Sequence, residues 1–118
     1  PKQWRWHEWL RVEIDGRKIA FSHGLSANVL NAVKGMGCCY VQGHHHTKFN
    51  IEYLGSFNGH TTWGMTVGCL IDDAALAFRY NKLQLARPIL GVGLIVNGVP
   101  LLIEMRLDAN GRWAKTLS

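Results

Sequence analysis

Alternation of apolar and charged residues predicts a β-hairpin near the start of the chain. Leu10, Val12 and Ile14 fall on one face of an extended backbone, with charged residues between them. The dipeptide Asp15-Gly16 is a strong signal for a two-residue turn, and an apolar segment follows it. We therefore expect a hairpin over about residues 9–22.

After this hairpin the apolar positions change to helical spacing. Ser26 is a suitable N-cap, and a glycine at position 35 or 37 would end the helix. The apolar positions lie three or four residues apart: Ala27, Leu30 and Val33, with Leu25 just before them. The next apolar run, residues 38–42, predicts a strand. Strand, helix and strand in this order favour a parallel pair joined by a crossover.

The rest of the chain predicts antiparallel strands. Residues 48–53 alternate, and residues 61–67 are the expected partner strand. The continuous apolar run 89–96 predicts a central strand, which the turn Asn97-Gly98 connects to a return strand at 100–105. The predicted class is α/β, with one strand–helix–strand unit and a series of antiparallel β-hairpins.

Length and charge set limits on this picture. A chain of 118 residues is long enough for one domain with a modest core, so we treat residues 1–118 as a single domain. The net charge of +5 comes from 13 Lys and Arg against 8 Asp and Glu. These charges are dispersed along the chain, which permits a polyanionic partner without requiring one.

Cysteine usage and hydropathy indicate a cytoplasmic protein. Cys38 and Cys39 are adjacent and would point to opposite faces of a strand, and with Cys69 they make an odd number. A disulfide framework is therefore not expected, and a reducing compartment fits better. The longest apolar run, residues 89–96, is far too short to cross a membrane, and no basic-then-apolar leader opens the chain.

Histidines follow the ends of two neighbouring predicted strands. His23 comes after the hairpin, and three consecutive histidines, residues 44–46, follow Gly43 after the next strand. Parallel strands end at the same edge of a sheet, so these side chains should leave from neighbouring positions. Imidazole is a good ligand for zinc, iron, nickel and copper. Alternatively, His23 is a hydrogen-bonded turn residue and the later cluster is a solvated loop, but their convergence favours a metal site.

These blocks resemble the last two signature blocks of the calcineurin-like metallophosphoesterases. In that family a lone histidine after one strand precedes a Gly-His-x-His block after the next, and Ser22-His23-Gly24 and Gly43-His44-His45-His46 follow this pattern. The segments 63–69 and 87–93 further resemble phosphoesterases found in phage and prophage sequences. The likeness covers about residues 4–105.

The resemblance implies a hydrolase of phosphomonoesters or phosphodiesters that uses a water activated by two divalent metal ions, Mn, Fe or Zn. By position, His23 and His44 resemble ligands of the second metal, and His46 resembles a ligand of the first. His45 occupies the variable place between them, next to the substrate. The fold it implies is half of a four-layer α/β/β/α sandwich. The implied partner is a phosphate-ester substrate, with nucleic acid among the candidates.

The sequence also departs from the family pattern. Its Asp-x-His, Gly-Asp and Gly-Asn-His-Asp/Glu blocks, which supply carboxylate ligands and the catalytic histidine, do not occur in these 118 residues. Our hypothesis is that the chain is the C-terminal half of such an enzyme, inactive alone and with its catalytic residue unassigned. An exposed apolar face would then drive association with the missing half or into a homo-oligomer.

Two early tryptophans suggest an alternative class. Trp4 and Trp6 would share a face of an extended segment with Arg5 between them, which could form a stacking platform for bases. Packing against this domain's core or another segment is the commoner role of large aromatic side chains. The alternative function is therefore a non-catalytic nucleic-acid-binding or structural module with a vestigial metal site.

The remaining polar candidates have simple structural interpretations. His60 lacks a second histidine nearby, and we interpret it as a turn residue. Asp72 and Asp73 could be an acid–base pair, but capping of a short helix at residues 74–78 is the commoner role. A basic cluster either contacts phosphate or faces solvent, and its members are Arg79, Lys82 and Arg87, with Tyr80 among them.

Overall fold

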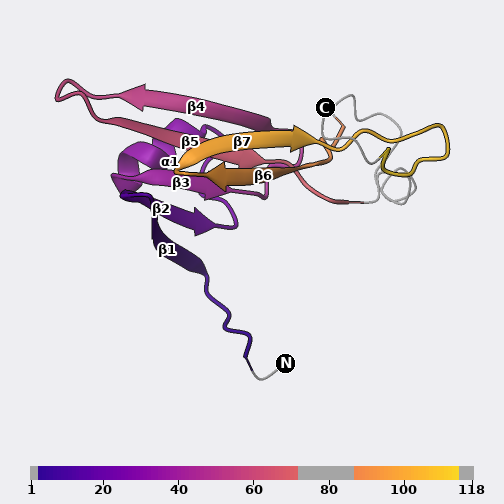
Figure 1. Ribbon diagram of the computed structural model, residues 1–118, viewed down its shortest axis with the longest axis horizontal. Helices are drawn as coiled ribbons and strands as arrows, with labels where there is room; N and C mark the ends of the chain where they lie inside the picture. The colour runs from indigo at the N-terminus through magenta and orange to yellow at the C-terminus, as the bar shows by residue number, and fades with distance from the viewer. Residues whose placement is uncertain (1–2, 72–86, 115–118) are drawn as a thin grey trace.

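Seven β-strands and one α-helix make up the part of the chain that the computed structural model describes, residues 3–71 and 87–114. The result is a compact mixed α+β fold composed mostly of strands (Figure 1). In chain order the elements are β1 (Trp9–Ile14), β2 (Arg17–Ser22), α1 (Val29–Met36), β3 (Cys39–Gln42), β4 (Phe49–Gly55), β5 (Thr61–Val67), β6 (Gly91–Val96) and β7 (Val99–Glu104).

Five strands form the main sheet, in the order β1-β2-β3-β5-β4. The three inner strands β2, β3 and β5 are parallel, and the two edge strands pair antiparallel with their neighbours. The predicted hairpin at about residues 9–22 and the predicted parallel pair with its helical crossover are both confirmed. Because the inner strands run in one direction, their carboxyl ends lie at the same edge of the sheet.

Helix α1 covers one face of this sheet. Its side chains Val29 and Val33 pack with Ala20 of β2 and Tyr40 of β3, all nearly inaccessible to solvent. Opposite α1, Gly64 of β5 leaves room for the helix, because a Cβ there would lie 2.7 Å from Val29. This glycine allows the helix to pack directly on the centre of the sheet.

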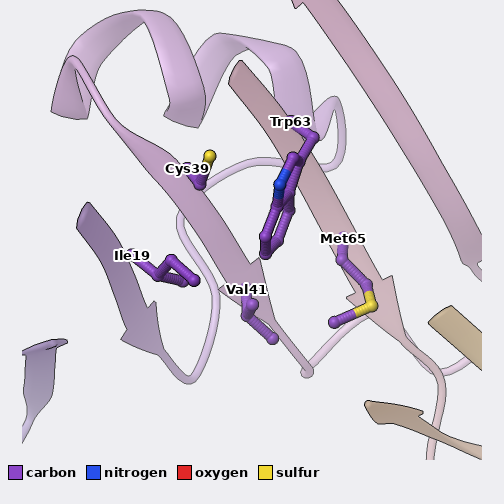
Figure 2. Close-up of a cluster of buried hydrophobic side chains, with 5 residues drawn as sticks. All are labelled: Ile19, Cys39, Val41, Trp63 and Met65. Atoms are coloured by element: carbon purple, nitrogen blue, oxygen red, sulfur yellow. The ribbon is translucent and has the colours of Figure 1, made fainter. Parts of the chain in front are cut away.

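The other face of the sheet carries the larger core and is covered by the β6–β7 hairpin. Its buried side chains, drawn in Figure 2, are Ile19, Cys39, Val41, Trp63 and Met65. The indole Nε1 of Trp63 donates a hydrogen bond of 3.2 Å to the Gly98 carbonyl in the β6–β7 turn. Helix, sheet and hairpin therefore form three stacked layers.

The predicted start of the helix is wrong by two residues. Asn28 is the N-cap, and its side chain accepts a hydrogen bond from the Leu30 N–H. Ser26 instead accepts from the Asn28 N–H, so both polar side chains satisfy backbone donors but only the second begins the helix. The shift also changes the buried face, which consists of Val29, Ala32 and Val33. The helix ends at Gly37 in the left-handed conformation, one of the two predicted terminators.

The predicted central strand at residues 89–96 is also wrong. The strand within it, β6, pairs with β7 in a separate two-stranded sheet that packs on the main one. Gly91 and Gly93 face the main sheet, where a Cβ would lie 2.6 Å from the Phe49 ring and from Val67, respectively. The run is therefore apolar at every position for a different reason. Val92, Leu94 and Val96 point outward, whereas Gly91, Gly93 and Ile95 face the main sheet, where the glycines allow close packing.

The N-terminal tryptophans do not pack into the core of this domain. Trp4 is 66% exposed and Trp6 is 86% exposed, in a segment that leads away from the sheet (Figure 1). Their ring centroids are 6.0 Å apart, so the two rings contact each other. Among the residues that the structure describes, none belongs to a helix with the length and hydropathy needed to cross a bilayer.

Candidate metal centre

His23 and His44 come together at the carboxyl edge of the parallel strands. His23 directly follows β2, and His44 lies one residue beyond Gly43, which follows β3. The Nε2 atom of His23 is 2.8 Å from the Nδ1 atom of His44, and the two rings meet edge to face with centroids 4.7 Å apart. The prediction that these two histidines leave from neighbouring positions is therefore confirmed.

Glycines bring the two histidines within hydrogen-bonding distance. The Gly43 N–H donates to the His23 carbonyl at 3.0 Å, which links the two strand ends. A Cβ on Gly24 would lie only 2.7 Å from the Cβ of His44, so any larger residue at position 24 would push the ring away. His44 itself has φ 59°, a left-handed conformation that costs energy for a residue with a side chain.

A buried glutamine supports the loop that carries His23. Gln42, at the end of β3, is 1% exposed and its Oε1 accepts from the Leu25 N–H at 3.1 Å. Its Nε2 donates to the Ser26 carbonyl at 2.7 Å and to Thr66 Oγ1 at 3.2 Å. Sequence reasoning missed this residue. The available signal was a long polar side chain at the end of an otherwise apolar strand.

His45 and His46 are placed differently from the His23–His44 pair. The His45 ring lies 5.0 Å from the His44 ring, centroid to centroid. Partial burial lowers the pKa of His45 below the ordinary value of 6.5, and the nearby His44 and Lys48 lower it further. The His46 carbonyl accepts from the Ile89 N–H at 2.8 Å. Within the described ranges, no hydrogen bond or ring contact joins the His46 side chain to His23 or His44.

The two ring nitrogens form a hydrogen bond with each other, and their separation is close to that of two ligands of one metal ion. With metal–nitrogen bonds of about 2.0–2.1 Å, neighbouring ligand nitrogens lie roughly 2.9–3.4 Å apart. The observed 2.8 Å separation is just below this range, so a small movement of either ring would suffice. Over residues 3–71 and 87–114, however, no group of three or more His, Cys, Asp or Glu residues is arranged to hold a metal ion. The two imidazoles fit part of a coordination shell that needs further ligands.

His60 is the further candidate histidine, and the structure places it away from this edge. His60 precedes β5 in the β4–β5 turn, where its carbonyl accepts from the Ser56 N–H at 2.9 Å, so its prediction as a turn residue is confirmed. Arg87 is exposed. The remaining candidates lie outside the described residues: Asp72, Asp73, the helix predicted at 74–78, Arg79, Tyr80 and Lys82.

No family model and no curated protein sequence matches the chain. The ligand roles of His23, His44 and His46 therefore stay predictions, supported by the geometry of the first two.

Proposed function

We propose that this chain provides histidine ligands to a metal-dependent phosphoesterase that hydrolyses a phosphomonoester or phosphodiester. The observation that carries the proposal is the 2.8 Å approach of His23 Nε2 and His44 Nδ1 at the carboxyl edge of a parallel sheet. This edge is where open α/β sheets bind their ligands. By the family resemblance, His23 and His44 bind the second metal of the pair, His46 binds the first, and His45 lies beside the substrate.

In this chemistry, the described residues of the chain hold the histidine ligands in place and orient their rings. Divalent Mn, Fe or Zn, when bound, lowers the pKa of a water and neutralises charge on phosphoryl oxygens. Gly24 and Gly43 set the distance between the two imidazoles, and Gln42 fixes the loop behind His23. Hard divalent ions also need oxygen ligands, which we expect from another segment or chain. The chain alone should therefore bind metal without hydrolysing esters.

The same proposal accounts for the layering of the fold. In this proposal, helix α1, the main sheet and the β6–β7 hairpin would form part of a four-layer α/β/β/α sandwich, which the core on each face of the sheet supports. The outer face of the hairpin exposes apolar side chains, among them Leu94 and Leu101, which a further layer would cover. We propose that either the remaining half of such a domain or a second copy of the chain covers it.

The cysteines fit a reducing environment. Cys38, Cys39 and Cys69 are all free thiols. Cys39 packs in the core beneath the hairpin, and Cys38 packs on the helix side, so the adjacent pair projects to opposite faces as expected. Free thiols are typical of reducing compartments, which supports our proposal of a cytoplasmic location.

Calorimetric titration with Mn²⁺ and Zn²⁺ tests the metal site directly. We expect His23→Ala and His44→Ala each to weaken binding by at least about tenfold, since each removes one ligand. His60→Ala is the matched control, because it removes an exposed imidazole away from the carboxyl edge. Metal binding that is absent, or that is unaffected by His44→Ala, would reject the proposed site.

A nucleic-acid-binding module is the second candidate function. The observation in its favour is the exposed Trp4–Trp6 pair with Arg5 between its members, in a chain of net charge +5. Such rings stack on bases with little sequence preference. Single-stranded DNA binding that weakens with salt, survives His44→Ala and is lost in Trp4→Ala and Trp6→Ala would favour this function over the enzyme.

A further inference from the structure

A cavity of about 370 Å³ opens beside His23 on the helix side of the sheet. It lies where α1 leaves part of the sheet uncovered, because the helix packs mainly on β3, β4 and β5. The lining residues are Glu8, Trp9, Ser22, His23, Gly24, Leu25 and Met36. Its volume falls within the range of small-molecule binding pockets. The cavity therefore adjoins one of the two proposed metal ligands.

Trp9 forms the aromatic wall of this cavity. It opens β1 and pairs with Ser22, the residue immediately before His23. Residues opposite each other in an antiparallel pair project to the same face, so the indole lies beside the strand end that carries His23. The Arg11 guanidinium lies 5.4 Å from the centroid of the Trp9 ring and stabilises it by a cation–π contact.

The walls of the cavity combine apolar side chains with one imidazole. Trp9, Leu25 and Met36 are apolar, and Trp9 is 50% exposed. The His23 imidazole also lines the cavity, and its Nε2 atom lies 2.8 Å from His44 Nδ1, where the proposed metal would hold phosphoryl oxygens. An apolar wall next to the proposed metal matches a ligand with a flat ring joined to a phosphate.

We infer that the cavity binds the aromatic ring of a phosphate ester whose phosphate lies at His23 and His44. This inference rests on the proposed function and names its substrate class, a nucleotide or an aryl phosphate. The ring stacks on Trp9 between Leu25 and Met36. Glu8, which also lines the cavity, would favour a nucleobase over a phenyl ring. Its carboxylate can accept a hydrogen bond from a nucleobase N–H, and a phenyl ring has no such donor.

The test is a calorimetric titration of the full chain in the presence of Mn²⁺. The titrants are adenosine 5′-monophosphate, phenyl phosphate and inorganic phosphate. We expect both ring-bearing phosphates to bind more tightly than inorganic phosphate. Trp9→Ala should weaken both by about tenfold and leave inorganic phosphate and Mn²⁺ binding unchanged. Trp9→Phe, which keeps a ring and the fold, should restore most of the loss. Glu8→Leu, which removes the acceptor, should weaken the nucleotide relative to phenyl phosphate.

Trp6→Ala is the matched control, because Trp6 is an exposed tryptophan that does not line the cavity. An equal loss in Trp6→Ala, or no preference for ring-bearing phosphates while Mn²⁺ binds, would overturn the cavity assignment and leave the metal site standing. Absence of Mn²⁺ binding would instead reject the proposed function. In that case the same phosphates are titrated without metal: a ring preference lost in Trp9→Ala supports the cavity, and no preference overturns it.

Discussion

At the scale of single residues, the placement of His44 depends on contacts that its own sequence neighbours do not reveal. Its φ of 59° is unusual for a residue with a side chain, and such a conformation persists where the surroundings fix it. The bond from the Gly43 N–H to the His23 carbonyl and the close approach of Gly24 provide that restraint. The order of strands predicted that His23 and His44 would be neighbours. The 2.8 Å contact was not predictable, because it depends on these tertiary restraints.

Substituting Gly24 by alanine tests this restraint. The added Cβ would lie 2.7 Å from the His44 Cβ, so the ring must move and the pair must separate. We expect Gly24→Ala to weaken Zn²⁺ binding by about tenfold or more, as loss of ligand positioning does at metal sites. Calorimetric titration measures the effect, and unchanged Zn²⁺ affinity would show that the loop adapts without cost.

Gly35→Ala is the matched control for that substitution. Gly35 lies inside α1, and a Cβ there would meet nothing within 4 Å. Alanine has the higher helix propensity, so we expect the free energy of unfolding to rise by about 0.5–1 kcal/mol with Zn²⁺ affinity unchanged. Urea unfolding of the two variants side by side separates a steric effect at the site from a general effect of removing glycine.

The environment of His45 predicts that the free energy of unfolding depends on pH. Burial, with the neighbouring His44 and Lys48, lowers its pKa below 6.5 because each disfavours the charged ring. The unfolded chain takes up this proton near pH 6.5 and the folded chain at lower pH, so the free energy of unfolding should fall as pH decreases through that window. Titration of the His45 ring by NMR should give a midpoint below 6.5, and Lys48→Gln should raise it.

At the scale of elements, local signals predicted strands better than they predicted the helix boundary. The turn at Asp15-Gly16 and the alternation before it were enough for the β1–β2 hairpin. The helix start was wrong because Ser26 and Asn28 are both good caps and both cap backbone donors in the structure. The choice between them depends on which register buries Val29 and Val33 against the sheet, and this is a tertiary contact.

Gln42 connects the strand β3 to the loop that carries His23 and to the neighbouring strand β5. Gln42→Ala removes its hydrogen bonds to Leu25, Ser26 and Thr66 and leaves backbone groups without partners. We expect the free energy of unfolding to fall by about 2–3 kcal/mol. Thr66→Val, which removes only the bond to Thr66, should cost about 1 kcal/mol.

Amide hydrogen exchange distinguishes two roles of Gln42, which are to stabilise the core and to fix the loop that carries His23. We expect faster exchange at the Leu25 N–H in Gln42→Ala and no change there in Thr66→Val, because only the first substitution removes the acceptor Oε1. Equal exchange in both variants would mean that Gln42 stabilises the core without fixing the loop.

At the scale of the whole molecule, the β6–β7 hairpin has two apolar faces, and the main sheet covers one of them. The inner face of the β6–β7 hairpin packs on the main sheet. The outer face exposes apolar side chains, each 38–49% accessible: Val92, Leu94, Val96, Val99 and Leu101. Periodicity could not predict which face is buried, because the run 89–96 is apolar at nearly every position. The close approach of Gly91 and Gly93 to the main sheet decides it.

An exposed apolar face of this kind predicts association of the isolated chain. Leu94 and Leu101 are opposite each other in the hairpin register, so a charge on either lies in the middle of the face. We expect the wild-type chain to self-associate in light scattering, and Leu94→Lys to shift it toward monomer. Phe57→Lys makes the same charge change at a fully exposed position in the β4–β5 turn and should leave the association unchanged. If the wild-type chain is monomeric at all concentrations, the outer face has no affinity for a second copy, and a different partner must cover it.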